Sequence, residues 1–170
     1  MISAIPVTAL ADACGGRLNQ HPLSEAAKIQ GLAIDSRLVQ SGDLFAALPG
    51  ERVDGHDFAE RAAQQGAAAL LVQRELDADC PQIVVEDCQQ ALASVGRLAR
   101  EQYEGVLVGI TGSAGKTTAK NLLRAVLAGV GRTLATEGNF NNELGVPLTL
   151  SRLDPAIEFA VLEMGAGKPG

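Results

Sequence analysis

The stretch that decides the fold is GITGSAGKTTAKNLL, residues 109–123. The short apolar run 106–108 precedes it, and this run predicts a buried strand. After it, apolar residues recur at i, i+3, i+4, i+7, i+8 and i+11 from Ala119 to Val130, so they share one face of a helix. Strand, glycine turn and helix therefore follow one another in the order of a phosphate-binding loop.

The turn itself has the chemistry of a polyphosphate site. Gly112 and Gly115 allow positive φ and close approach of a ligand, and the first N–H groups of the helix face the same spot. Lys116 can reach the terminal phosphates, and the Thr117 hydroxyl can bind a magnesium ion that bridges them. The usual GxxxxGK[ST] pattern has its first glycine one residue later than this chain does, so the local form is TGxxGKT. The alternative is an ordinary glycine turn that caps a helix.

Composition indicates a soluble globular protein. The 170 residues are 46% hydrophobic and 20% charged, which suits one domain or two small ones. The net charge of −6 argues against nucleic acid or an anionic membrane surface as a partner, and no apolar run approaches the length of a membrane span. Three cysteines without CxxC spacing favour reduced thiols over a disulfide or zinc site. The N-terminal residues make a poor signal peptide, so we expect a cytoplasmic protein without membrane insertion.

The rest of the chain predicts two α/β domains with a boundary near residue 86. In the first domain we expect helices over residues 8–14, with Thr8 as the cap, and 57–65, and strands over 29–34, 43–48, 67–72 and 82–85. In the second we expect helices over 88–103, capped by Asp87, and 145–153, and strands over 132–135 and 159–162. Strands that alternate with helices predict a parallel sheet with ligands at the carboxyl ends of its strands.

Three further segments could carry chemistry. Glu163 follows the apolar run 159–162, which places a carboxylate at the carboxyl edge of the sheet, where it could serve magnesium or simply face solvent. The amide-rich segment 138–142 could hold a ligand or merely form a turn. For His56 and for the sequence Asp-Ser-Arg at 35–37, a helix cap and a local ion pair are the simpler explanations.

Three motifs in order resemble the Mur ligases of bacterial cell-wall synthesis: TGSAGKTT, TEGNFNNELGVPLTL and AVLEMGAGKPG. The segment AIDSRLVQSGDLFAALPGERVDGHDF resembles the UDP-sugar-binding domain of the last two ligases of that pathway. GNFNNELGVP is similar to the member that adds D-alanyl-D-alanine to UDP-N-acetylmuramoyl-tripeptide (UDP-MurNAc-tripeptide). The sibling that adds the third residue would carry a Thr-Thr-Pro-Glu type of segment there. The resemblance covers the chain from about residue 31.

The resemblance implies an ATP-dependent amide ligase of peptidoglycan synthesis that uses magnesium. ATP would phosphorylate the terminal carboxylate of the tripeptide, and the amine of D-alanyl-D-alanine would attack the resulting acyl phosphate. The implied fold is α/β, with a small mixed UDP-sugar-binding domain over residues 1–86. The start of a P-loop parallel-sheet ATPase domain would follow over residues 87–170.

The resemblance also implies the residues of the site. Lys116 and Glu163 would be catalytic, and Thr117 and Glu163 would serve magnesium. ATP would bind Gly112, Ser113, Ala114, Gly115, Lys116, Thr117, Thr118, Asn139, Asn141 and Asn142. The UDP-sugar would bind Ser36, Arg37, Gly55 and His56.

Members of this family continue through the rest of the ATPase domain and a third domain that closes over ATP. We therefore expect these residues to be an N-terminal portion, monomeric and unable to ligate alone. Three alternatives stay open. They are a sibling ligase that adds a different amino acid, a phosphate-loop kinase or ATPase outside the family, and a nucleotide-binding module without catalysis.

Overall fold

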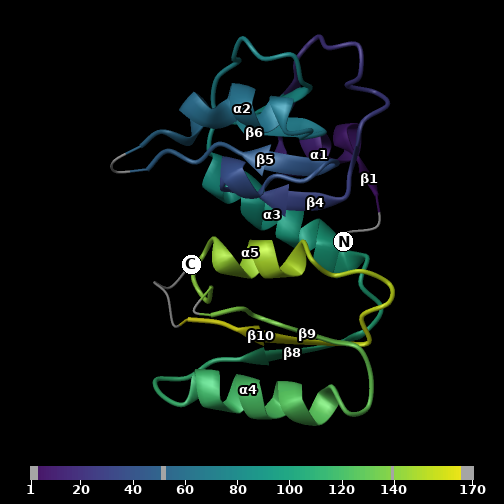
Figure 1. Ribbon diagram of the computed structural model, residues 1–170, viewed down its shortest axis with the longest axis vertical. Helices are drawn as coiled ribbons and strands as arrows, with labels where there is room; N and C mark the ends of the chain where they lie inside the picture. The colour runs from purple at the N-terminus through teal and green to yellow at the C-terminus, as the bar shows by residue number, and fades with distance from the viewer. Residues whose placement is uncertain (1–3, 51–52, 139, 166–170) are drawn as a thin grey trace. The chain divides into compact units, whose positions relative to one another are not determined.

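A computed structural model describes residues 4–50, 53–138 and 140–165 (Figure 1). Its contacts divide the chain into two compact units, residues 1–95 and 96–170. The division falls inside helix α3 (Cys88–Glu101), whereas the sequence predicted a boundary just before this helix. Each unit combines helices with a sheet, which confirms the α/β class.

The first unit is built on a mixed five-stranded sheet of order β2-β7-β6-β5-β4. Four strands are parallel, namely β4 (Gly31–Ala33), β5 (Asp43–Ala46), β6 (Ala69–Val72) and β7 (Gln82–Val84). Strand β2 (Arg17–Leu18) pairs with β7 in the antiparallel sense, and β1 (Ile5–Pro6) pairs separately with β3 (Lys28–Ile29). Sequence analysis missed β1 and β2 because a two-residue strand has no alternation to detect. It also merged β3 and β4, which are separate strands on either side of Gln30.

The helices of the first unit begin differently from the prediction. Helix α1 (Val7–Cys14) starts after Pro6 without a side-chain cap, so Thr8 lies inside the helix and does not cap it. Its end is as predicted, since Gly15 is left-handed with φ 62°. The predicted helix over 57–65 is instead a 3-10 turn, η2 (Gly55–Phe58), followed by the short helix α2 (Ala59–Gln64).

The second unit contains the phosphate-loop stretch and a parallel sheet of order β8-β10-β9. Its strands are β8 (Val106–Ile110), β9 (Thr133–Ala135) and β10 (Phe159–Glu163). Helices α4 (Lys116–Leu127) and α5 (Gly145–Leu150) cover opposite faces of this sheet (Figure 1). Because β10 lies between β8 and β9, the loops that follow both neighbours flank its carboxyl end.

Helix α4 presents an unexpected face to its sheet. The apolar positions predicted from the sequence include Leu122, Val126 and Val130, which are 65%, 67% and 71% exposed. The buried residue of the helix is Lys120, while Leu123 and Leu127 are half-buried. These last three positions are spaced i, i+3, i+7, so they form a second helical face next to the predicted one.

Each unit has its own apolar core. In the first unit, Phe45 and Leu70 pack with Ala59 and Ala62 of α2. In the second, Ala160 of β10 anchors a cluster with Tyr103, Leu153 and Ile157. Within the described ranges, no helix is long and apolar enough to cross a membrane.

Candidate nucleotide site

The phosphate loop joins the end of β8 to the start of α4, and two glycines shape it. Gly112 has φ 143° and Gly115 has φ 77°, conformations that residues with a side chain rarely adopt. Gly115 directly precedes α4, and a Cβ added there would meet nothing within 4 Å. The first N–H groups of a helix have no partner inside the helix. This geometry leaves the loop backbone open to an anion at a helix N-terminus.

The Lys116 side chain lies across this loop. Its Nζ donates a hydrogen bond to the carbonyl oxygen of Gly112 at 2.6 Å. A phosphate oxygen placed over the loop could take the place of that carbonyl as acceptor. The remaining predicted loop residues, Ser113, Ala114 and Thr118, are exposed.

Glu163 meets the phosphate loop at the carboxyl end of β10. Its Oε1 accepts hydrogen bonds from Thr117 Oγ1 at 3.1 Å and from Asn141 Nδ2 at 2.9 Å. Its backbone N–H donates to Thr136 Oγ1 at 3.0 Å, a contact that sequence analysis did not predict. The carboxylate is buried, with a relative exposure of 2%. The two residues expected to serve magnesium therefore touch, although they are distant in the sequence.

Lys120, like Thr136, is a residue of this cluster that sequence analysis missed. Its Nζ forms an ion pair with Glu163 Oε2 at 3.2 Å and donates to the carbonyl oxygen of Gly138 at 3.0 Å. The spacing of Lys120 with Leu123 and Leu127 was the available signal. A lysine in register with two leucines marks a helix face that is turned toward the protein.

The surroundings of Glu163 favour its charged form. The hydrogen bond from Asn141 lowers the pKa of Glu163, burial opposes this, and Lys120 and Thr117 lower it further. Among the described residues, Glu163 Oε2 makes its ion pair with Lys120 and no further hydrogen bond. A carboxylate oxygen with spare capacity beside a threonine hydroxyl offers the hard oxygen ligands that magnesium prefers, so these residues fit the ion. The described part of the chain holds no group of three or more His, Cys, Asp or Glu that could bind a metal ion. Phosphate and water oxygens would therefore have to complete the coordination.

In the amide-rich segment 138–142, Asn141 and Asn142 contact different elements. Asn141 contacts Glu163, and its carbonyl oxygen accepts a hydrogen bond from Gly165 N at 2.7 Å. Asn142 instead turns toward α5, where its Oδ1 accepts from Gly145 N at 2.8 Å. Asn139 lies outside the described residues. The structure thus brings Asn141 to the predicted metal ligands, whereas the Asn142 side chain holds the start of α5.

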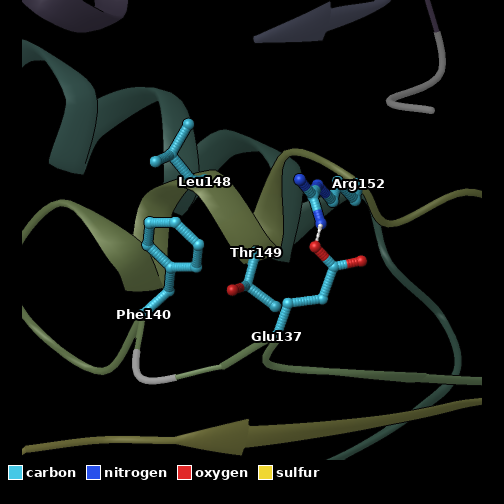
Figure 2. A pocket seen from close by; sticks show the side chains of 5 residues that line it. All are labelled: Glu137, Phe140, Leu148, Thr149 and Arg152. Atoms are coloured by element: carbon cyan, nitrogen blue, oxygen red, sulfur yellow. Dashed lines mark ion pairs between the residues drawn. The ribbon is translucent and has the colours of Figure 1, made fainter. Parts of the chain in front are cut away.

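A small pocket lies beside this segment (Figure 2). Glu137 and Arg152 close one side with an ion pair of 2.7 Å between Oε2 and Nη1. Phe140, which is 47% exposed, forms the opposite side, and Leu148 and Thr149 of α5 line the pocket between them. The ion pair therefore ties the segment after β9 to the residues that follow α5.

The residues expected at a UDP-sugar site lie in the first unit. Ser36 is buried in the turn η1 (Ser36–Leu38), whereas the Arg37 side chain is 72% exposed. Asp35 holds the guanidinium of Arg37 with an ion pair of 2.6 Å. Gly55 packs against Leu48, because a Cβ added to Gly55 would lie 2.6 Å from the backbone N and O of Leu48. Arg37 therefore offers an accessible cation in this group.

His56 is buried, and both of its ring nitrogens contact other groups of the first unit. Its Nδ1 lies 2.6 Å from Asp54 Oδ1, and its Nε2 accepts a hydrogen bond from Gln73 N at 2.9 Å. Since Nε2 accepts, the proton resides on Nδ1 and is donated to Asp54, which gives a neutral imidazole. His56 therefore joins η2 to the end of β6.

Comparison with known proteins identifies the family. Residues 28–103 match the model of the Mur ligase family, catalytic domain, and residues 110–170 match the Mur ligase middle domain. The chain is 42% identical over 170 residues to UDP-N-acetylmuramoyl-tripeptide--D-alanyl-D-alanine ligase of Escherichia coli, covering 100% of this chain and 36% of that protein. It thus spans about a third of the length of that relative.

Solved structures agree with the sequence comparison. A crystal structure of MurF from Acinetobacter baumannii matches with a TM-score of 0.85 and 38% identity, over 99% of this chain and 37% of that one. The MurF ligase from Thermotoga maritima in complex with ADP matches with a TM-score of 0.72 and 37% identity, over 83% and 33% of the two chains. The two family models together match most of the sequence, and the chain belongs to the Mur ligase family.

Proposed function

We propose that the whole protein containing this chain is an ATP-dependent ligase that joins D-alanyl-D-alanine to UDP-MurNAc-tripeptide in peptidoglycan synthesis. The observation that carries the nucleotide part is the contact between Thr117 and Glu163 beside an open phosphate loop. The substrates are inferred from the name of the Escherichia coli relative. Since the chain spans about a third of that relative, the activity is proposed for the whole protein.

The proposed reaction has two steps. A carboxylate oxygen of the tripeptide attacks the γ-phosphorus of ATP, and ADP leaves. The amine of D-alanyl-D-alanine then attacks the acyl carbon, loses a proton, and expels phosphate as the amide forms. A bound magnesium ion would neutralise charge on the phosphates. Such catalysis relies on positioning and charge, which a backbone loop and a lysine can supply.

In this proposal the residues of the cluster have separate roles. Lys116 and the loop N–H groups hold the phosphates, while Thr117 and Glu163 hold the metal. Asn141 orients Glu163 through their hydrogen bond. The loop residues Ser113, Ala114 and Thr118 line the nucleotide, and we keep Asn139 and Asn142 as proposed neighbours of it.

We propose the first domain, residues 1–86, as the UDP-sugar-binding part and residues 87–170 as the start of the ATPase domain. The exposed guanidinium of Arg37 supports this, since a nucleotide diphosphate needs an accessible cation. Ser36, Gly55 and His56 would then shape the backbone around the ligand, because Ser36 and His56 are buried. We further propose that the protein acts in the cytoplasm as a monomer.

The full-length protein carrying Lys116→Ala tests this function. We expect at least about a 100-fold loss of ADP release that depends on both UDP-MurNAc-tripeptide and D-alanyl-D-alanine, because charge stabilisation of the transferred phosphoryl group is lost. Arg124→Ala is the matched control, since it removes an exposed cation from the same helix.

An amine panel with the wild type decides among the alternatives. Preference for a single amino acid over the dipeptide would indicate a sibling ligase, and turnover of ATP without UDP-sugar would indicate a kinase or ATPase. Unchanged nucleotide affinity in Lys116→Ala would mean that the loop is structural.

A further inference from the structure

Helix α4 buries a lysine, while a leucine and a valine of the same helix are exposed. The Lys120 side chain is 4% exposed, whereas Leu122 and Val126 on the same helix are 65% and 67% exposed. Lysine is among the residue types least often buried, and a buried ammonium needs partners for its charge and its protons. Apolar packing therefore does not explain the position of Lys120.

Lys120 joins the segment that follows β9 to the last residue of β10. It donates to Gly138 in the segment after β9, and it forms its ion pair with Glu163 at the end of β10. Thr117 and Asn141 both donate to the other oxygen of that carboxylate. Within the described residues, the partner of Glu163 Oε2 is the Lys120 ammonium at 3.2 Å, so Lys120 supplies the counter-charge of this carboxylate.

We propose that Lys120 is a positioning residue of the nucleotide site, which aims Glu163 at Thr117 and makes metal binding depend on the nucleotide. This inference rests on the proposed function. Because Lys120 balances the charge of Glu163, a free divalent cation gains little attraction from this pair and is repelled by the ammonium. Phosphate oxygens bring the additional negative charge that the cation needs, so cation and nucleotide bind together.

A purely structural role predicts different behaviour. In that case Lys120 would only fasten the segment at Gly138, and its loss would cost the same stability with or without metal. In our proposal, Lys120→Met leaves Glu163 as an uncompensated buried charge, which is strongly unfavourable. A divalent cation then becomes the available counter-charge. Lys120→Arg keeps the positive charge and therefore keeps the wild-type response to metal.

Thermal unfolding of the full-length protein without nucleotide separates the two roles. We expect Lys120→Met to melt below the wild type in EDTA, and magnesium to restore most of the difference while shifting the wild type and Lys120→Arg little. Calorimetric titration with magnesium alone should show about a tenfold tighter affinity for Lys120→Met. The double variant Lys120→Met, Glu163→Gln removes both charges and should lose the response to magnesium.

Equal losses of stability with EDTA and with magnesium would overturn the proposal, as would the same magnesium response in Lys120→Met and Lys120→Arg. A Lys120→Met protein that folds only with magnesium supports it, and one that folds in neither condition overturns it. ADP binding by the wild type is measured alongside. Its absence would refute the proposed function, whereas the magnesium response of Lys120→Met is read without any nucleotide.

Discussion

At the scale of single residues, Asp54 connects three groups of the first unit. Its carboxylate accepts from the backbone N–H and the imidazole of His56, and it pairs with Arg74 at 3.2 Å. The hydrogen bond from the His56 backbone and then that from its imidazole are the largest effects on the pKa of Asp54; burial opposes them, Arg74 adds a smaller lowering, and the pKa falls from 3.8 to about 2. A carboxyl with a lowered pKa stabilises the fold above its unfolded-state pKa, and this contribution disappears as the pH falls through the folded-state value.

The first prediction at this scale is therefore a pH-dependent effect of Asp54→Asn. The variant should melt below the wild type at pH 7, because His56 and Arg74 lose a charged acceptor. The difference in melting temperature between the variant and the wild type should shrink as the pH falls from about 4 toward about 2, where the wild-type carboxylate becomes protonated. Melting curves across this range measure it. Asp57→Asn on the same turn is the control, and a gap that stays constant with pH would show that charge at Asp54 does not stabilise the fold.

The residues of the nucleotide site differ in how far sequence could identify them. Lys116 and Thr117 belong to one local motif, and Glu163 follows an apolar run, so both signals are contained in short windows. Thr136 has no such signal, and the spacing of Lys120 with Leu123 and Leu127 indicates a helix face but not a partner, because the contacts of both residues with Glu163 exist only once the strands lie side by side. The residues of the local motifs could thus be named from the sequence, and their metal and nucleotide roles stay predictions, while the groups that hold Glu163 could not be named.

At the scale of elements, local signals predicted some helix ends, such as the start of α3 and the end of α1, but not the starts of α1 and α2 and not the buried faces. Asp87 caps α3 as expected, since its Oδ1 accepts from Gln89 N at 2.7 Å and from Gln90 N at 3.1 Å. The face of α4 was not predictable in this way. Leu123 and Leu127 belong both to the predicted apolar face and to the neighbouring face with Lys120, and the side that turns inward is the one on which Lys120 pairs with Glu163 of β10.

Gly145 gives the prediction at the scale of elements. It starts α5, and an added Cβ would collide with the backbone carbonyl group of Phe140. Gly145→Ala should therefore push the segment containing Asn141 away from Glu163, at a cost of about 2 kcal/mol in the free energy of unfolding. Denaturant unfolding of the full-length protein measures this cost, and nucleotide affinity should fall with it.

Gly129→Ala is the matched control for this change. Gly129 follows α4, and a Cβ added there would meet only the carbonyl oxygen of Val126 at 3.4 Å. Its effect should be within about 0.5 kcal/mol. If Gly145→Ala were equally mild, the contact between Phe140 and α5 would not position the segment.

At the scale of the whole molecule, the exposed stripe of α4 has a consequence for the full-length protein. Leu122 and Val126 form an exposed apolar row on the side of α4 away from Lys120, and the exposed Val130 follows just beyond the end of the helix at Leu127. The chain spans about a third of its Escherichia coli relative, so most of a protein of that length lies outside these 170 residues. Because exposed apolar rows mark surfaces that another element covers, we expect this stripe to be buried in the full-length protein.

Val126→Lys in the full-length protein tests this expectation. If the stripe is covered, a buried charge replaces a packed valine, and the free energy of unfolding should fall by about 2 kcal/mol or more. Asn121→Lys introduces the same side chain at an exposed polar position of the same helix and should change stability little. Denaturant unfolding of the two variants beside the wild type measures the difference. Equal stability of Val126→Lys and Asn121→Lys would mean that this face of α4 meets solvent in the complete protein.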